Sequence, residues 1–192
     1  YANTTGANNT ATGYQALYSN TTGSLNTAFG RRALRTNTTG QNNTAVGANA
    51  LYDNTTGNYN TAVGEDALLL NTTASNNTAV GYQAGGSNLI GADNTYIGFG
   101  AGYSGTNYYN TAVGKYSLYN STGAYNVAMG TGALQANTTA SNNTAVGYQA
   151  LYNNTTGTRN TATGYGSLRL NTTGANNVAN GFEALRENTT GL

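Results

Sequence analysis

Apolar residues recur along the chain in two short groups per repeat, with polar turns between them. In the stretch from Asn142 to Gly157, NNTAVGYQALYNNTTG, the two groups are T-A-V and A-L-Y. Both are too short for a helix and are typical of short strands. The Asn, Thr and Gly residues between them disfavour helix and suit caps and tight corners. The pattern therefore predicts an all-β chain of short strands joined by tight corners.

The same pattern repeats through the whole chain. An Asn opens each NTA-like segment, and these Asn residues follow one another every 17 residues, with two steps of 16 around Asn110. The consensus unit is N-T-T-G-x-x-N-T-A-V-G-x-x-A-L-x-x. A regular period of this kind indicates a repeat architecture. The register residues are Asn9, Asn26, Asn43, Asn60, Asn77, Asn94, Asn110, Asn126, Asn143, Asn160 and Asn177.

A unit of this length is too short for a helix–turn–helix repeat. We therefore predict one coil per repeat, in a parallel β-solenoid or β-roll of about eleven coils. Coils that stack at roughly 4.8 Å give a rod about 50 Å long. Residues 1–192 form a single repeat array on this interpretation. Since the first and last units resemble interior ones and the chain begins with Tyr, we expect it to be a fragment of a longer fibre.

A glycine follows every T-A-V group without exception. This column predicts a bend where no side chain fits, or a positive φ angle. Its members are Gly13, Gly30, Gly47, Gly64, Gly81, Gly98, Gly114, Gly130, Gly147, Gly164 and Gly181.

Two apolar columns flank the glycine. One lies before it: Phe29, Val46, Val63, Val80, Ile97, Val113, Met129 and Val146. The other follows it: Leu17, Leu34, Leu51, Leu68, Leu118, Leu134, Leu151, Leu168 and Leu185. Because they lie on opposite sides of the bend, one column fills the coil and the other is free to form a seam between chains; the sequence leaves open which. The core is thin, so stacked Asn and Thr side chains are expected to add hydrogen bonds from coil to coil.

Residues 85–109 depart from the pattern. The leucine column changes to Gly85 and Gly102, and the coil shortens by one residue. We expect a kink, a narrower coil or a changed contact between chains there, or simple drift of one repeat.

The unit NTAVGYQAL resembles the head repeats of trimeric autotransporter adhesins and repeats of phage tail fibres. The resemblance covers the whole chain and implies a stacked parallel coil, assembly into trimers and a place on a cell or virion surface. The adhesin unit is shorter and lacks the N-T-T-G corner.

Composition excludes several kinds of chemistry. The chain has no Cys, His, Trp or Pro, its net charge is +1 and only 7% of its residues are charged. Thiolate and imidazole catalysis, a polyphosphate partner and a repeated acidic calcium motif are therefore not expected. Neither an enzyme, a cofactor nor a membrane span is predicted. The adjacent acids Glu65 and Asp66 would point to opposite faces of a strand.

Sequons of the form N-x-S/T are frequent. If the chain is secreted, they are candidate N-glycosylation sites. The alternative is that Asn-Thr pairs are good corner residues and produce sequons by accident. The corner column comprises Asn3, Asn20, Asn37, Asn54, Asn71, Asn120, Asn137, Asn154, Asn171 and Asn188, and further sequons begin at Asn8, Asn42, Asn76, Asn142 and Asn153.

Tyrosine is the main aromatic residue, with 16 copies. Tyr14, Tyr82, Tyr148 and Tyr165 follow the glycine, and Tyr18, Tyr52, Tyr119 and Tyr152 follow the leucine. A stripe of this kind binds sugars or neighbouring fibres, or only stabilises the coil as a ladder. Ice binding is disfavoured because the repeat lacks the T-x-T pattern of flat ice-binding faces.

The sequence favours an extracellular structural fibre that associates with itself as a homo-oligomer or filament. The alternative is an adhesin head or phage fibre shaft that binds surface glycans. The near absence of irregular loops favours the first.

Overall fold

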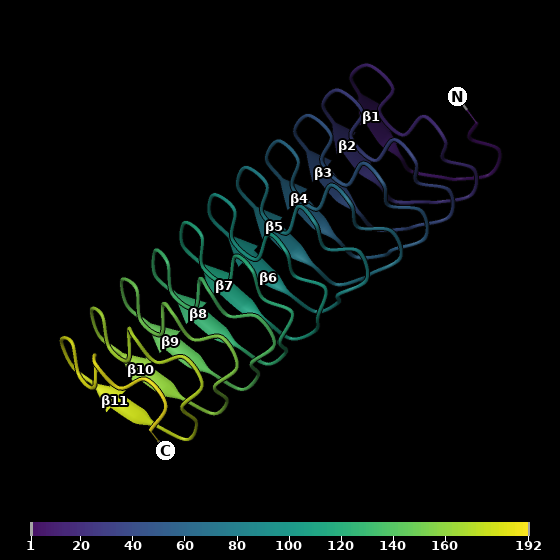
Figure 1. The fold of residues 1–192 in the computed structure, drawn as a ribbon. Coiled ribbons are helices and arrows are strands. Elements are labelled where there is room, and N and C mark those ends of the chain that lie inside the picture. The colour runs from purple at the N-terminus through teal and green to yellow at the C-terminus, as the bar shows by residue number, and fades with distance from the viewer. Residues whose placement is uncertain (1, 192) are drawn as a thin grey trace.

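The computed structural model describes residues 2–191 and confirms the all-β solenoid with one repeat per coil. Within them, eleven parallel strands form one sheet in chain order, from one end of the rod to the other (Figure 1). The strands are β1 (Thr10–Thr12), β2 (Thr27–Phe29), β3 (Thr44–Val46), β4 (Thr61–Val63), β5 (Thr78–Val80), β6 (Thr95–Ile97), β7 (Thr111–Val113), β8 (Val127–Met129), β9 (Thr144–Val146), β10 (Thr161–Thr163) and β11 (Val178–Asn180).

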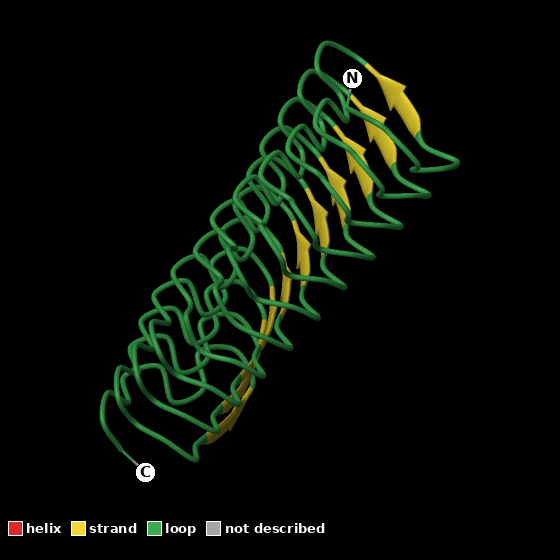
Figure 2. Ribbon diagram, turned by 90° about the vertical axis from the view of Figure 1, so that its right-hand side faces the viewer, coloured by secondary structure: helices red, strands yellow, loops and turns green. Residues whose placement is uncertain are grey.

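Neighbouring strands pair in register, so each column of the sequence is a column in space. Ala45 lies opposite Ala62, and Val46 lies opposite Val63. Figure 2 shows the strands along one side of the rod and turns around the rest. The turns also bond from coil to coil: the Leu51 N–H donates to the Ala67 carbonyl at 3.0 Å, and the Thr38 N–H to the Thr55 carbonyl at 2.9 Å. Hydrogen bonds therefore run along the rod axis all around the coil.

Leucine and alanine fill the coil, and the valine column faces outward. In a typical strand the central Ala is buried and its two neighbours are partly exposed. The leucines that follow the glycine bend are almost all buried. This resolves the question that the sequence left open. The buried apolar interior includes Ala28, Leu34, Ala45, Leu51, Ala62, Leu68, Ala112, Leu118, Ala128, Leu134, Ala145, Leu151, Ala162 and Leu168.

The buried leucines have a left-handed backbone. Leu34, Leu51 and Leu151 have φ angles of 50°, 52° and 51°. For a side chain other than glycine this conformation costs about 1–2 kcal/mol, whereas burying a leucine contributes about 1.5–3 kcal/mol. The turn is therefore held in place by the side chain that it directs inward.

The glycine column meets both of its predicted requirements. Its members have φ between 125° and 140°. A Cβ on Gly47 would lie 2.5 Å from the carbonyl oxygen of Gly64 in the next coil. Only a residue without a side chain fits between coils so closely spaced.

The corner asparagines form a ladder inside the coil. Asn54 Nδ2 donates to Asn37 Oδ1 of the preceding coil at 2.8 Å and to the Gly57 carbonyl of its own corner at 3.0 Å. Asn71 Nδ2 donates in turn to Asn54 Oδ1 at 2.9 Å. All three asparagines are fully buried. Each amide therefore closes its own corner and ties two coils together.

The register asparagines form a second ladder beside the first. The Asn43 N–H donates to Asn26 Oδ1 at 3.0 Å, and Asn43 Nδ2 donates to the Gly57 carbonyl at 2.8 Å. The same carbonyl also accepts the bond from Asn54 described above. Both ladders therefore meet at the corner glycine, and the inside of the coil is polar on one side and apolar on the other.

The irregular segment around residue 96 retains the strand register but fills its core differently. Gly85 and Gly102 take the left-handed position of the missing leucines, each with φ of 59°. The ring of Tyr96 replaces the usual strand alanine and occupies the vacated space; a Cβ on Gly102 would clash with its Cδ1 and Cε1 atoms. β5, β6 and β7 pair without interruption. The segment therefore differs by an exchange of core side chains within a continuous stack, which is none of the alternatives that the sequence suggested.

Burial of Tyr96 has an electrostatic cost. Its hydroxyl is buried and finds no hydrogen-bond partner among residues 2–191. Desolvation raises the pKa of Tyr96 well above its ordinary value. A Cβ on Gly105 would clash with this hydroxyl. The corner position that holds asparagine in most coils is thus taken by a glycine, which makes room for the phenol.

We predict that Asn54→Asp severely destabilises the coil. The new carboxylate would face the Asn37 amide oxygen and the Gly57 carbonyl, which are both acceptors, so two hydrogen bonds are lost and a buried charge is left unpaired. The expected loss in the free energy of unfolding is at least about 3 kcal/mol. Urea unfolding measures it. Asn176→Asp, at an exposed asparagine, is the matched control and is expected to change stability little; equal losses would contradict the ladder.

We also predict that Tyr96 and Gly102 are energetically coupled. Tyr96→Ala leaves a cavity, with an expected cost of about 3–5 kcal/mol, and Gly102→Leu alone clashes with the ring. The double variant restores the Ala and Leu found in regular coils. A double-mutant cycle by urea unfolding should give a favourable interaction energy of about 1–3 kcal/mol. Additive effects would show that the two positions do not share one space.

Candidate functional site

The outward face of the strands is uncharged and partly apolar. Each strand presents its first and third residues, usually Thr and Val, and none of these positions holds a charged residue. Phe29 is 58% exposed and Met129 is 44% exposed. In-register pairing aligns these side chains in two parallel rows. The result is a continuous band without charge along one side of the rod.

Aromatic side chains form ladders on the turns. Tyr148 stacks on Tyr165 with ring centroids 5.1 Å apart, and Tyr165 stacks on Phe182 at 5.2 Å. On other columns, Tyr109 stacks on Tyr125 and Tyr103 on Tyr119, each at 5.1 Å. Because the rings lie face to face along the rod, they turn their edges to solvent. Sugars stack on ring faces, so this arrangement favours the stabilising ladder over the sugar-binding stripe.

A denser aromatic cluster lies outside the irregular coils. Phe99 stacks on Tyr82 at 5.1 Å and meets Tyr116 edge-on at 5.3 Å. The Lys115 ammonium lies 5.1 Å from the Tyr116 ring centroid. Burial is the largest cause that raises the pKa of Tyr119, and the interaction with the neighbouring Tyr103 raises it further. Aromatic packing outside the coil thus accompanies the loss of leucine inside it.

Several charged side chains contact residues of the neighbouring coil. Arg35 donates to the Tyr52 hydroxyl at 2.8 Å and lies 5.4 Å from the centroid of that ring. Burial raises the pKa of Asp53, and the nearby Arg35 charge partly offsets this. Asp66 accepts a hydrogen bond from Asn49 Nδ2 at 3.0 Å. Among residues 2–191, no three acidic or other metal-binding side chains gather at one point.

The ladder removes most of the corner asparagines from consideration as glycan acceptors. A sugar on a buried amide would displace the neighbouring coil and break the bonds of the ladder. For these residues the predicted acceptor role is incompatible with the folded coil. They are Asn20, Asn37, Asn54, Asn71, Asn137, Asn154 and Asn171.

Asn120 lies outside the corner column in which its sequon suggests it belongs. The steps from Gly105 to Ser121 and from Ser121 to Asn137 are each 16 residues, so Ser121 takes the corner position: Asn137 Nδ2 donates to Ser121 Oγ at 2.9 Å, and Ser121 is buried. Asn120 lies one position earlier and is exposed, as is Asn3, whereas Asn188 is half-buried. Sequence reasoning also missed Asn88, which lacks a sequon but lies buried in the ladder and donates to the Gly91 carbonyl at 2.8 Å. A count of corner positions by spacing, and not by sequon, would have found Asn88 at 17 residues after Asn71 and, with the 16-residue steps included, Ser121.

The sequons before the strands differ from those in the corner. Asn76 and Asn142 are exposed, and Asn42 is half-buried. All three have a left-handed backbone, with φ of 61°, 62° and 56°. Their side chains lie outside the ladders, so the coil leaves room for modification there.

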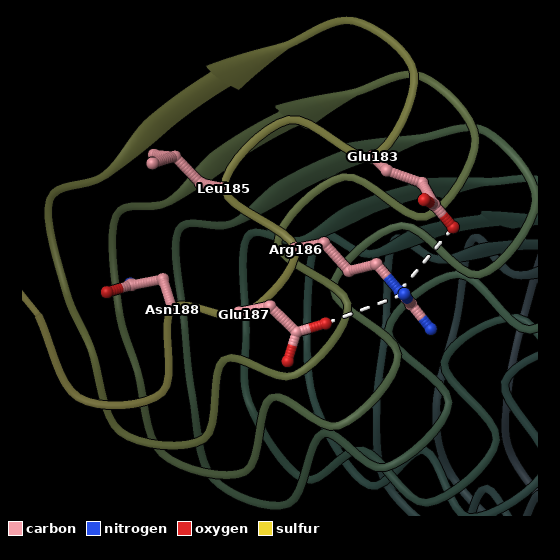
Figure 3. Close-up of a pocket in the computed structure, with 5 residues that line it drawn as sticks. All are labelled: Glu183, Leu185, Arg186, Glu187 and Asn188. Carbon is pink, nitrogen blue, oxygen red and sulfur yellow. Dashed lines mark ion pairs between the residues drawn. The ribbon is translucent and has the colours of Figure 1, made fainter.

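A hollow lies at the last coil, lined by Glu183, Leu185, Arg186, Glu187 and Asn188 (Figure 3). Arg186 lies 3.5 Å from a carboxylate oxygen of Glu183 and equally far from one of Glu187. Leu185 is 53% exposed, whereas its counterparts in interior coils are buried. In those coils the next coil covers the same positions. The hollow is therefore the outer face of the last coil that the structure describes.

We predict that any N-glycans avoid the ladder. When the chain is directed through a eukaryotic secretory pathway, peptide mapping of the folded product should find sugar at Asn120, Asn76 or Asn142 and none at Asn37 or Asn54. Asn120→Gln should remove only its own glycan. Folded, thermally stable protein that carries sugar on Asn54 would contradict the burial of that amide.

No helix in residues 2–191 is long and apolar enough to cross a membrane. In comparisons with protein-family models, with curated proteins and with solved structures, nothing matches the chain.

Proposed function

We propose that this chain is the shaft of a structural surface fibre, in which copies associate side by side through the outward strand face. The observation that carries the proposal is the apolar column on that face. The apolar side chains inside the coil are buried, but four on this face are exposed to solvent: Phe29, Val80, Ile97 and Met129. An uncharged band of aligned apolar side chains is typical of an interaction surface.

The band supplies more than half of the area that such an interface needs. Eleven strands spaced about 4.8 Å apart, each about 10 Å long, give a face of roughly 500 Å². A standard protein–protein interface buries about 800 Å² per partner. The neighbouring aromatic ladders supply additional apolar area. The partner that best fits a flat face with a fixed repeat is a second copy with the same repeat, because its side chains have the same spacing.

The internal structure supports a mechanical role. Within residues 2–191, every coil is joined to the next by strand pairing, by turn hydrogen bonds and by the register asparagines, and the corner asparagines add a second ladder that is interrupted at Gly105. Stretching or bending the rod must break these bonds together. Stiffness is therefore distributed along its length, as a shaft requires. A position outside the cell or on a virion is part of the proposal and rests on the resemblance of the repeat to surface fibres.

Binding to a cell-surface glycan is the alternative function. The stacked tyrosines offer it ring edges and hydroxyls, and the long loops that usually form a receptor site are missing from residues 2–191. Ice binding has less support. Thr and Val point outward together, but the larger Phe29, Ile97 and Met129 interrupt the flat array.

We predict that lysines on the strand face separate the copies. Val80→Lys with Val113→Lys places like charges in the proposed seam, so the dissociation constant should rise at least tenfold, or about 1.4 kcal/mol. Sedimentation velocity measures the assembly, and circular dichroism confirms the fold. Thr56→Lys with Thr139→Lys adds the same charge at exposed corner positions and should leave the multimer intact. A wild-type chain that stays monomeric at high micromolar concentration would refute the proposal, as would equal dissociation of both variants.

A further inference from the structure

Two pairs of tyrosines on neighbouring coils are stacked, nearly parallel and exposed. Tyr109 and Tyr125 have centroids 5.1 Å apart and planes 13° apart, and they are 53% and 57% exposed. Tyr148 and Tyr165 are also 5.1 Å apart, with planes 17° apart, and are 44% and 48% exposed. Both phenols of each pair are accessible to a reagent in solution.

The solenoid fixes this geometry. Equivalent positions of successive coils are held at the coil spacing, so a tyrosine that recurs at one position always faces its own copy. The two rings are therefore already beside each other before any reaction. Their outward position allows them to tilt toward one another without disturbing the buried core.

We propose that these two pairs are sites of oxidative phenol coupling, which joins neighbouring coils by dityrosine. The oxidant is hydrogen peroxide acting through a peroxidase. Each phenol loses one electron and one proton to give a tyrosyl radical. The two radicals join at ring carbons ortho to the oxygens, and the hydrogens on these carbons move to restore both phenols. The peroxide takes up two electrons and two protons and becomes two waters.

The link would close a short loop around one coil. Tyr148–Tyr165 and Tyr109–Tyr125 each connect residues about one repeat apart, so a coil could no longer separate from its neighbour by unwinding. Cross-links of this kind restrict the unfolded chain and stabilise the folded one. This inference needs only the geometry within one chain and does not depend on the proposed assembly.

The chain contains its own controls. Tyr165 and Phe182 stack in the same way, at 5.2 Å and 12°, but phenylalanine has no phenol to oxidise. Tyr14 and Tyr59 are more exposed than the paired tyrosines, and neither stacks on another ring within residues 2–191. Tyr103 and Tyr119 are stacked but half-buried within the aromatic cluster. They should react more slowly than the two exposed pairs.

The experiment treats dilute protein with horseradish peroxidase and limiting hydrogen peroxide. We expect a species that migrates as one chain, fluoresces as dityrosine and has lost two hydrogen atoms per link. Proteolysis and mass spectrometry should locate the links at Tyr109–Tyr125 and Tyr148–Tyr165, and the midpoint of thermal unfolding should rise. Tyr125→Phe should abolish the first link and leave the second.

Phe182→Tyr gives the sharpest test, because it converts a matched but unreactive stack into a reactive one. It should create a new link between positions 165 and 182. The proposal is overturned if coupling involves Tyr14 and Tyr59 as readily as the stacked pairs, if Tyr125→Phe leaves the pattern of links unchanged, or if Phe182→Tyr forms no link while circular dichroism shows it folded.

Discussion

The structure depends on satisfying amide groups inside a coil that is too thin for an ordinary hydrophobic core. A corner that turns inward buries carbonyls and N–H groups, and each one without a partner costs about 1–3 kcal/mol. Asparagine solves this problem because its side chain carries both a donor and an acceptor. Its Nδ2 closes the corner and reaches the coil before it, while its Oδ1 accepts from the coil after it. The two bonds to neighbouring coils do not exist in an isolated coil, so the repeat is stable only as a stack.

In the apolar half of the interior, a large side chain at one position is combined with small ones at the other, so that the coil stays filled. A regular coil combines a strand alanine with a turn leucine, as in Ala62 and Leu68. At Tyr96 the large side chain moves to the strand, and the turn positions shrink to glycine. The left-handed turn makes this exchange easy, since glycine adopts that conformation without the strain that leucine tolerates. The stack therefore admits local variation as long as the coil stays filled and the strands stay in register.

The 17-residue period, the short T-A-V and A-L-Y groups and the Asn, Thr and Gly residues between them were together enough to predict the fold. The unbroken glycine column also predicted the positive φ angles and close packing at these positions, because few other constraints require glycine in every repeat. Whether the valines point into the coil or outward could not be predicted, because a T-A-V strand is equally compatible with Val or Ala inside. Only the packing against the leucine of the turn decides it. Hydrogen bonds between stacked asparagines could be predicted from the repeat, and the corner ladder contains them. The burial of Asn37 and Asn54 could not, because a polar residue in a corner resembles a surface residue until the shape of the coil around it is known. Asn120 shows the same limit, because the 16-residue steps on either side of Ser121 place it outside the column that its sequon suggests.

The central claim, that buried asparagine ladders hold the coils together, is tested most directly by hydrogen exchange of the side-chain amides, followed by NMR. Interior ladder amides such as Asn54 Nδ2 and Asn143 Nδ2 should exchange as slowly as the strand backbone, because both open only when coils separate. The exposed amides of Asn76 and Asn142 provide the fast reference. Ladder amides that exchange as fast as these, while the strands remain protected, would contradict the account.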